Sequence, residues 1–255
     1  MRRASTIGVV FLFGLVGCAT THGVRRVGEL EVHTFRRDWA NAHAVVGPGG
    51  AFLFDAGLER NAEALDQDLR AAGLDPGSLR AVILSHGHAD HAGGARVFRE
   101  RYGTPIVAAR ADGPMLRAGH NDPLCPTDDD ARGRVEEDGA ETFQPFEPDV
   151  WVDASVELGP LTGVHGRIVP LPGHTPGSLV VVLDEVALVG DLFRGTVFTE
   201  GASVHFYMCD LEDNHADVRE LLDALAPSAH TFFPGHFGPL ARGAVEDAFP
   251  ARGAR

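Results

Sequence analysis

Short apolar runs alternate with longer amphipathic stretches along most of this 255-residue chain. Two stretches, 61–72 and 213–226, carry apolar residues at helical spacing. In the second, Val218, Leu221 and Leu225 share one face, which predicts a helix with a buried side. The runs are three to five residues long, as expected for buried strands, and occur at 51–54, 81–84, 105–109, 150–152, 168–171, 179–183, 186–189 and 231–233. Strands interleaved with helices predict an α/β fold.

A dense group of metal-binding side chains follows one of the predicted strands. The sequence S-H-G-H-A-D-H ends at His91 and comes directly after the apolar run 81–84. Residues i and i+2 on an extended chain point the same way, so His86 and His88 can bind one ion. Asp90 and His91 then turn toward a second position. Burying so many polar groups without a cation would be costly, which favours a metal site.

Four other apolar runs also end in a polar side chain. Asp55 closes the run 51–54, and Asp191 follows the run 186–189 after a glycine. His174 lies among glycine and proline residues, where the backbone can turn sharply and leave an imidazole exposed. His236 follows the last run in the same way. Each signal alone is weak, but together and in this order they indicate one site.

With these motifs, the chain resembles the metallo-β-lactamase superfamily from about Glu29 to Phe249, and specifically its binuclear hydrolases, the glyoxalase II-like thioesterases and the acyl-homoserine lactonases. The resemblance implies an αββα sandwich of two facing mixed β-sheets with helices outside. It also implies two Zn²⁺ ions, with iron or a mixed metal pair as the alternative. In this scheme metal one is held by His86, His88 and His174, and metal two by Asp90, His91 and His236. Asp191 bridges both metals. Asp55 supports the site without binding metal.

The implied chemistry is hydrolysis of an ester, thioester or lactone by a metal-bridging hydroxide. Two cations lower the pKa of a shared water toward about 7 and polarise the substrate carbonyl. Asp90 is the expected catalytic residue, orienting the hydroxide and moving its proton to the leaving group. The Gly190-Asp191 pair makes a β-lactamase less favoured, because those enzymes usually carry Cys or Ser near this position. A mononuclear iron dioxygenase of sulfur compounds, of the persulfide type, remains the alternative.

The candidate contacts for a small-molecule substrate come after the fourth motif. They are Arg194, His205 and Tyr207. The chain contains no lysine, so the lysine with which typical glyoxalase II enzymes grip glutathione has no counterpart. The lactonases usually carry a tyrosine soon after the bridging aspartate, where this chain has Arg194. Neither substrate class is therefore singled out.

The stretch 112–147 differs from its surroundings because it is rich in acidic residues, proline and glycine and lies between two ligand motifs. Long segments of this kind in compact domains are often functional or mobile, so we expect either a lid over the site or a solvated surface loop. Met115, Leu116 and Phe143 within it could supply apolar contacts.

The amino terminus resembles a bacterial lipoprotein signal. A short basic start precedes an apolar stretch at 7–16, and Leu15-Val16-Gly17-Cys18 reads as a lipobox. This predicts a signal peptide at 1–17, lipid on Cys18, a tether at 18–28 and a hydrolase domain at 29–255. The expected location is the outer membrane facing the periplasm, with the membrane contacted only through lipid. An ordinary secretory signal or an uncleaved anchor is the alternative.

The net charge of the chain narrows the classes of possible binding partner. Removing residues 1–17 takes two arginines away, so the formal net charge changes from −14 to −16. Such an acidic surface repels nucleic acid, and we expect no nucleic-acid partner.

An oxidising compartment permits a disulfide between Cys125 and Cys209, but their spacing in the sequence does not fix the distance between them. We expect both cysteines to be free or structural.

Overall fold

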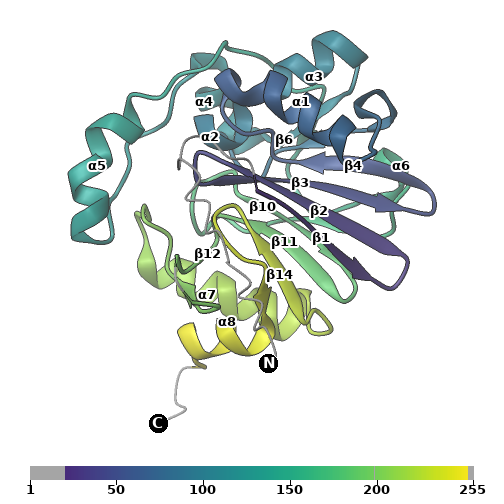
Figure 1. Cartoon of the computed structure of the whole chain (residues 1–255). Coiled ribbons are helices and arrows are strands. Elements are labelled where there is room, and N and C mark those ends of the chain that lie inside the picture. The colour runs from purple at the N-terminus through teal and green to yellow at the C-terminus, as the bar shows by residue number, and fades with distance from the viewer. Residues whose placement is uncertain (1–20, 198, 252–255) are drawn as a thin grey trace, which may run out of the picture.

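The computed structural model describes residues 21–197 and 199–251 and has four layers. Two β-sheets face each other, and helices cover the outer face of each (Figure 1). This arrangement is the αββα sandwich that the resemblance implies, so the fold prediction is confirmed. The signal peptide predicted at 1–17 and Cys18 lie outside the described residues. Part of the predicted tether, residues 21–27, forms an edge strand instead.

The first sheet has seven strands in the order β1-β2-β3-β4-β5-β6-β7. β1 to β4 are antiparallel neighbours, whereas β4 to β7 run parallel to one another. The carboxyl ends of these parallel strands therefore meet at one edge. The strands are β1 (Thr21–Val27), β2 (Leu30–Arg37), β3 (Ala40–Gly47), β4 (Gly50–Phe54), β5 (Val82–Ile83), β6 (Ile106–Ala109) and β7 (Val150–Val152).

The second sheet has six strands in the order β15-β14-β11-β10-β9-β8. β10 is antiparallel to both neighbours and β11 is parallel to β14, so β9, β11 and β14 also end at one edge. A short hairpin, β12 and β13, follows β11. The strands are β8 (Val156–Glu157), β9 (Arg167–Pro170), β10 (Leu179–Leu183), β11 (Val186–Gly190), β12 (Arg194–Gly195), β13 (Ala202–Ser203), β14 (Thr231–Pro234) and β15 (Leu240–Ala241).

The helices form two outer layers and one projecting arm. Helices α1 and α3 lie over the first sheet and α7 and α8 over the second, while α5 stands apart at one side (Figure 1). Among the described residues, every helix is too short or too polar to cross a bilayer. The helices are α1 (Ala62–Ala71), α2 (Ala89–Ala92), α3 (Ala95–Tyr102), α4 (Gly113–Ala118), α5 (Asp129–Gly139), α6 (Gly159–Thr162), α7 (Leu211–Glu220) and α8 (Arg242–Ala248).

Side-chain alternation along the strands builds a separate core between each pair of layers. On β4, Phe52 and Phe54 point into the core between the sheets, whereas Leu53 points toward the helices. On the second sheet, Val180 and Val182 pack beneath α7 and α8. Burying a side chain of this size contributes roughly 1.5–3 kcal/mol, so both faces of each sheet stabilise the fold.

The structure decides two points that the sequence left open for the segment 112–147. Leu116 and Phe143 are buried in the core beneath the first helical layer, and Met115 is buried as well, so they are structural rather than substrate contacts. Cys125 and Cys209 form a disulfide, with their Cα atoms 4.9 Å apart. The sequence left open whether these two cysteines pair, and the structure shows that they do. The bond ties 112–147 to the segment between β13 and α7.

Candidate metal centre

The predicted ligands converge because strands of both sheets end at the same edge of the sandwich. Asp55 follows β4, His86 comes shortly after β5, His174 follows β9, Asp191 follows β11 and His236 follows β14. The parallel arrangement within each sheet places these strand ends together, as it does for ligand sites in other α/β folds.

Hydrogen bonds between the two sheets fix this edge. The amide of Leu179, at the start of β10, donates to the carbonyl of Ser85 over 2.7 Å. The buried side chain of Asn41 donates to the carbonyls of Pro234 and Phe237 over 2.9 and 2.7 Å. These hydrogen bonds therefore hold together the segments of the two sheets that carry the predicted ligands.

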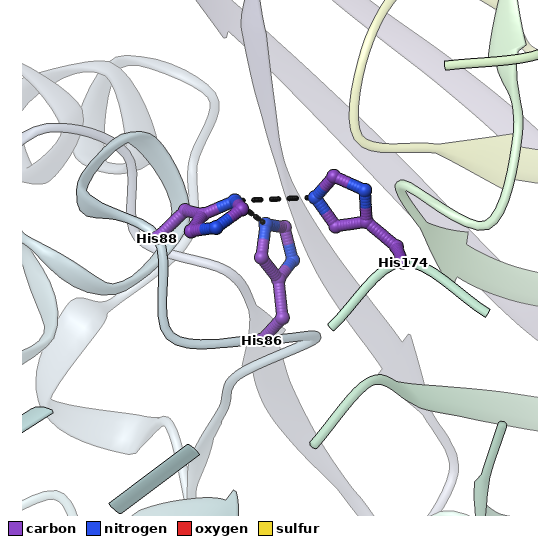
Figure 2. Close-up of side chains that lie close together, drawn as sticks. All are labelled: His86, His88 and His174. Carbon is purple, nitrogen blue, oxygen red and sulfur yellow. Dashed lines mark hydrogen bonds between the residues drawn. The ribbon is translucent and has the colours of Figure 1, made fainter. Parts of the chain in front are cut away.

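One cluster contains three histidines whose rings point toward one another (Figure 2). Nδ1 of His88 lies 3.1 Å from Nε2 of His86 and 3.1 Å from Nε2 of His174. Nitrogens at this spacing can all approach one ion at the usual zinc–nitrogen distance of about 2.0–2.1 Å. The three residues assigned to metal one are thus brought together.

A second cluster lies beside the first. Oδ2 of Asp90 is 3.4 Å from Nε2 of His91 and 3.4 Å from Nε2 of His236. These are the three residues assigned to metal two, and their ligand atoms all lie within 4.8 Å of one another. The Asp90 side chain is 32% exposed, so it faces both this cluster and the open cavity.

Asp191 lies between the two clusters. Its Oδ2 atom is 3.8 Å from Nε2 of His86 and 3.7 Å from Nε2 of His174 on one side. On the other side it is 3.3 Å from Nε2 of both His91 and His236. This carboxylate therefore reaches both clusters, as the predicted bridging residue would.

The electrostatics of the site fit metal cations. Nε2 of His91 and Oδ1 of Asp191 are buried without a hydrogen-bond partner in the described part of the chain. Such atoms carry a desolvation cost that a bound cation would offset. Burial opposes ionisation of Asp191, but the surrounding imidazoles, His205 and His91 foremost, hold the pKa of its carboxyl well below its usual range.

The ligand histidines differ in their protonation. Burial, followed by neighbouring histidines, lowers the pKa of His86 well below its usual value, which leaves the neutral form that binds metal. Burial also disfavours the charged form of His91, but Asp191, Asp90 and Asp55 raise the pKa of its imidazole well above the usual value. Metal binding would therefore release a proton from His91.

Asp55 contacts the candidate ligand His91 through the ring nitrogen that does not face the second cluster. Its Oδ1 accepts the amide of Ser85 over 2.7 Å, and its Oδ2 lies 2.9 Å from Nδ1 of His91. A proton on Nδ1 directs the Nε2 lone pair of His91 toward the second cluster. The position agrees with the supporting role that the resemblance implies.

Backbone carbonyls orient two further ligands. Nδ1 of His174 lies 3.0 Å from the carbonyl oxygen of Tyr207, and Nδ1 of His236 lies 3.0 Å from that of Trp39. Each contact places the ring proton on Nδ1 and leaves Nε2 for the metal.

Two acidic residues of the segment 112–147 also support the site, and the sequence motifs did not point to them. The buried Asp112 carboxylate accepts the amides of Gly87 and Gly177 and the hydroxyl of Thr175, each over 2.8 Å. It thereby joins the loop carrying His86 and His88 to the loop carrying His174. Asp122 contacts His88 from the side opposite the metal cluster.

A cavity of about 790 Å³ opens in front of the two clusters. Its walls combine aromatic side chains with an excess of carboxylates contributed largely by α5 and the segments that flank it. The lining includes Trp39, Phe206, Tyr207, Phe237, Asp38, Asp129, Asp130, Glu137, Asp138, Glu141, Arg60 and Arg134, together with His88, Asp90, Asp191, His205 and His236.

The three predicted substrate contacts have different surroundings. Tyr207 lines the cavity, with its hydroxyl donating to Asp138. His205 lies deeper, with Nε2 3.0 Å from Oδ2 of Asp191. The guanidinium of Arg194 lies 3.9 Å from the centre of the Phe206 ring and is not part of the cavity lining. In this structure Arg194 packs over the ring of Phe206, which lines the cavity.

Comparison with known proteins links this centre to hydrolases. Probable metallo-hydrolase YybB of Bacillus subtilis is 29% identical over 180 residues, which cover 69% of this chain and 72% of that protein. Hydroxyacylglutathione hydrolase GloC of Haemophilus influenzae is 29% identical over 157 residues, which cover 60% of this chain and 63% of GloC. The chain thus matches less than two thirds of the length of GloC.

A solved structure shares the fold at lower identity. The Rm3 metallo-beta-lactamase superposes with a TM-score of 0.60 and 21% identity, covering 82% of this chain and 76% of that one. The family model of the metallo-beta-lactamase superfamily matches residues 38–236, a range that contains both ligand clusters and the bridging aspartate. The chain is therefore a member of the metallo-β-lactamase superfamily and a metal-dependent hydrolase.

Proposed function

We propose that this protein is a binuclear zinc hydrolase that cleaves an ester, thioester or lactone. The observation that carries this proposal is the position of Asp191 between two complete ligand clusters, within 3.8 Å of four histidine nitrogens that belong to those clusters. Two divalent ions held there would lower the pKa of a shared water toward about 7 and polarise the substrate carbonyl.

Asp90 is the residue best placed to handle the proton. Its carboxylate faces the second cluster and the cavity at once. From this position it can orient the attacking water, accept its proton and deliver that proton to the departing alkoxide or thiolate. The acyl–oxygen or acyl–sulfur bond breaks as the new carbon–oxygen bond forms, so no further reactant is needed.

The charge of the cavity argues against a glutathione thioester. Arg60 already forms ion pairs with Glu141 and Asp38, at 2.7 and 3.4 Å. Arg134 lies 3.6 Å from Asp138 and over the Phe206 ring. Both arginines of the cavity lining are therefore engaged, and the remaining charges repel the carboxylates of glutathione.

A neutral or cationic substrate with an apolar portion fits these walls better. The Trp39 side chain is exposed at the cavity and lies near the ring of Phe237, with 6.0 Å between the ring centres. Together with Phe206 they offer an apolar surface to an acyl chain or ring. We therefore assign substrates of this class to the hydrolase.

Metal analysis with activity assays tests the proposal against the iron dioxygenase alternative. We expect about two zinc ions per chain and hydrolysis of a neutral aryl ester, thioester or lactone without oxygen uptake. One iron per chain with oxygen consumption on a persulfide substrate would overturn the proposal. The complete second cluster, with its unpartnered His91 nitrogen, favours two metals.

Replacing the bridge tests the binuclear part separately. Asp191→Asn keeps the shape of the side chain but removes the charge that offsets repulsion between two cations. We expect loss of one metal and a fall in turnover by orders of magnitude. Asp184→Asn, at a side chain that is 83% exposed, is the matched control. Full metal content and parental turnover in Asp191→Asn would contradict the assignment of the bridge.

A further inference from the structure

His205 comes from the segment between β13 and α7, outside the five motifs, yet its ring lies inside the metal centre. Its Nε2 is 3.0 Å from Oδ2 of Asp191, closer than any other histidine nitrogen measured to that oxygen. The ring centre lies 4.6 Å from that of His174 and 5.1 Å from that of His236. The residue is only 3% exposed.

The Nε2 atom of His205 is buried without a hydrogen-bond partner in the described residues, as is Nε2 of His91. Although it lies near Asp191, the two atoms do not form a well-directed hydrogen bond. Two ligands of one ion approach each other at about this distance without sharing a proton. His205 therefore has the same signature as the assigned ligand His91.

The other ring nitrogen of His205 is held by the main chain. Nδ1 lies 3.2 Å from both the amide nitrogen and the carbonyl oxygen of Tyr207, and Nδ1 of His174 contacts the same carbonyl over 3.0 Å. Nδ1 can accept from the Tyr207 amide when the ring proton is on Nε2, or donate to the Tyr207 carbonyl when a metal takes Nε2. In the metal-bound state this carbonyl would therefore accept from Nδ1 of two neighbouring histidines, His174 and His205.

The segment carrying His205 is held against the segment 112–147. The hydroxyl of Thr127 donates to the carbonyl of His205 over 2.8 Å, and the amide of Thr127 donates to the carbonyl of Phe206 over 2.8 Å. The Cys125–Cys209 disulfide links the same two segments covalently. The ring is therefore positioned by the fold, as a ligand has to be.

We infer that His205 is a further ligand of the metal centre, binding through Nε2 beside His174 and Asp191. The ligand atoms of these three residues lie within 4.8 Å of one another. This inference rests on the proposed function, because it requires that the clusters hold metal.

Cobalt binding to the full chain tests the inference with a readout other than activity. Apo protein is titrated with Co²⁺, and the affinity, the visible absorption and the metal-induced rise in melting temperature are measured. The informative variant is His205→Gln, because a glutamine amide keeps a polar side chain beside Asp191 but is not a usual ligand of such sites. His205→Ala removes the polar side chain altogether, and His165→Gln, at a side chain that is 86% exposed, is the control.

We expect both His205 variants to bind Co²⁺ at least about tenfold more weakly, with altered absorption and a smaller metal-induced stabilisation. His165→Gln should match the parent. If the apo form of His205→Ala fails to fold, His205→Gln decides. Unchanged cobalt affinity and absorption in His205→Gln would overturn the inference, even where turnover falls. A parent that binds no Co²⁺ would overturn the proposed function as well.

Discussion

Oδ1 of Asp122 lies 2.7 Å from Nε2 of His88, on the side of the ring that faces away from His86 and His174. A carboxylate in this position holds a proton on Nε2 and leaves Nδ1 for the metal. The neighbouring Asn121 accepts the amide of Ala89 over 2.8 Å. The segment 112–147 therefore supports the predicted metal-binding loop directly.

Removing this carboxylate should weaken metal binding. We expect Asp122→Ala to lower the affinity for the metal held by His88 about 10-fold to 100-fold, because the ring loses the partner that fixes its tautomer. Competition with a chromophoric chelator measures this affinity. Asp129→Ala removes a carboxylate that is 96% exposed on the same segment and should have no effect. Equal affinities for the two variants would show that Asp122 does not orient His88.

The glycine before the last ligand is required by close packing. A Cβ atom at Gly235 would lie 2.2 Å from Oδ1 of Asp191 and 2.6 Å from Cε1 of His91. We expect Gly235→Ala to displace both ligands and lower metal content and melting temperature together. Gly243→Ala adds a methyl group where nothing lies within 4 Å and serves as the control. Parental metal content in Gly235→Ala would mean that the ligands can shift without loss.

The ligand motifs could be predicted from sequence because each follows an apolar strand, and strand ends are encoded locally. Asp112 and Asp122 could not, because their function depends on contacts with Gly87 and His88 made only after folding. His205 was predicted as a substrate contact, since nothing in its local sequence reveals its 3.0 Å approach to Asp191.

The strands β1 to β3 were missed for a different reason. On β2, buried Val32 and Phe35 are separated by the polar pair His33 and Thr34, so no apolar run marks the strand.

The Cys125–Cys209 disulfide joins residues 84 positions apart, and only the tertiary structure brings them together. The pairing of cysteines that lie far apart in the chain therefore cannot be predicted from the pattern of apolar and polar residues.

The disulfide should stabilise the segments around the cavity. Replacing both Cys125 and Cys209 by serine removes a cross-link across 84 residues, and we expect a loss of about 2–4 kcal/mol in the free energy of unfolding. Denaturant unfolding with and without reductant measures it. The parent should respond to reductant, whereas the double variant should not. A parent that is equally stable when reduced would contradict a stabilising role.

The lipid anchor remains a sequence prediction that a single substitution can test. Cys18→Ser removes the thiol that a lipoprotein signal would acylate. We expect the variant to lose the lipid mass and to leave the membrane fraction or accumulate as precursor, while Cys209→Ser keeps its membrane association. Unchanged fractionation and mass in Cys18→Ser would show that residues 1–17 act as an ordinary signal or an uncleaved anchor.

Asp217 on α7 should make stability depend on pH. Burial first, and then Glu220 and Asp213, raise the pKa of its carboxyl from 3.8 to about 6. Between these two values the folded state binds more protons than the unfolded state, so stability falls as the pH rises through this window and stays lower above it. Asp217→Asn removes the charge, and we expect its melting temperature to exceed that of the parent at neutral pH and the difference to shrink toward pH 3.8. Melting curves across this range measure the difference, with Asp184→Asn as an exposed control. A difference that does not change with pH would rule out Asp217 as the titrating group.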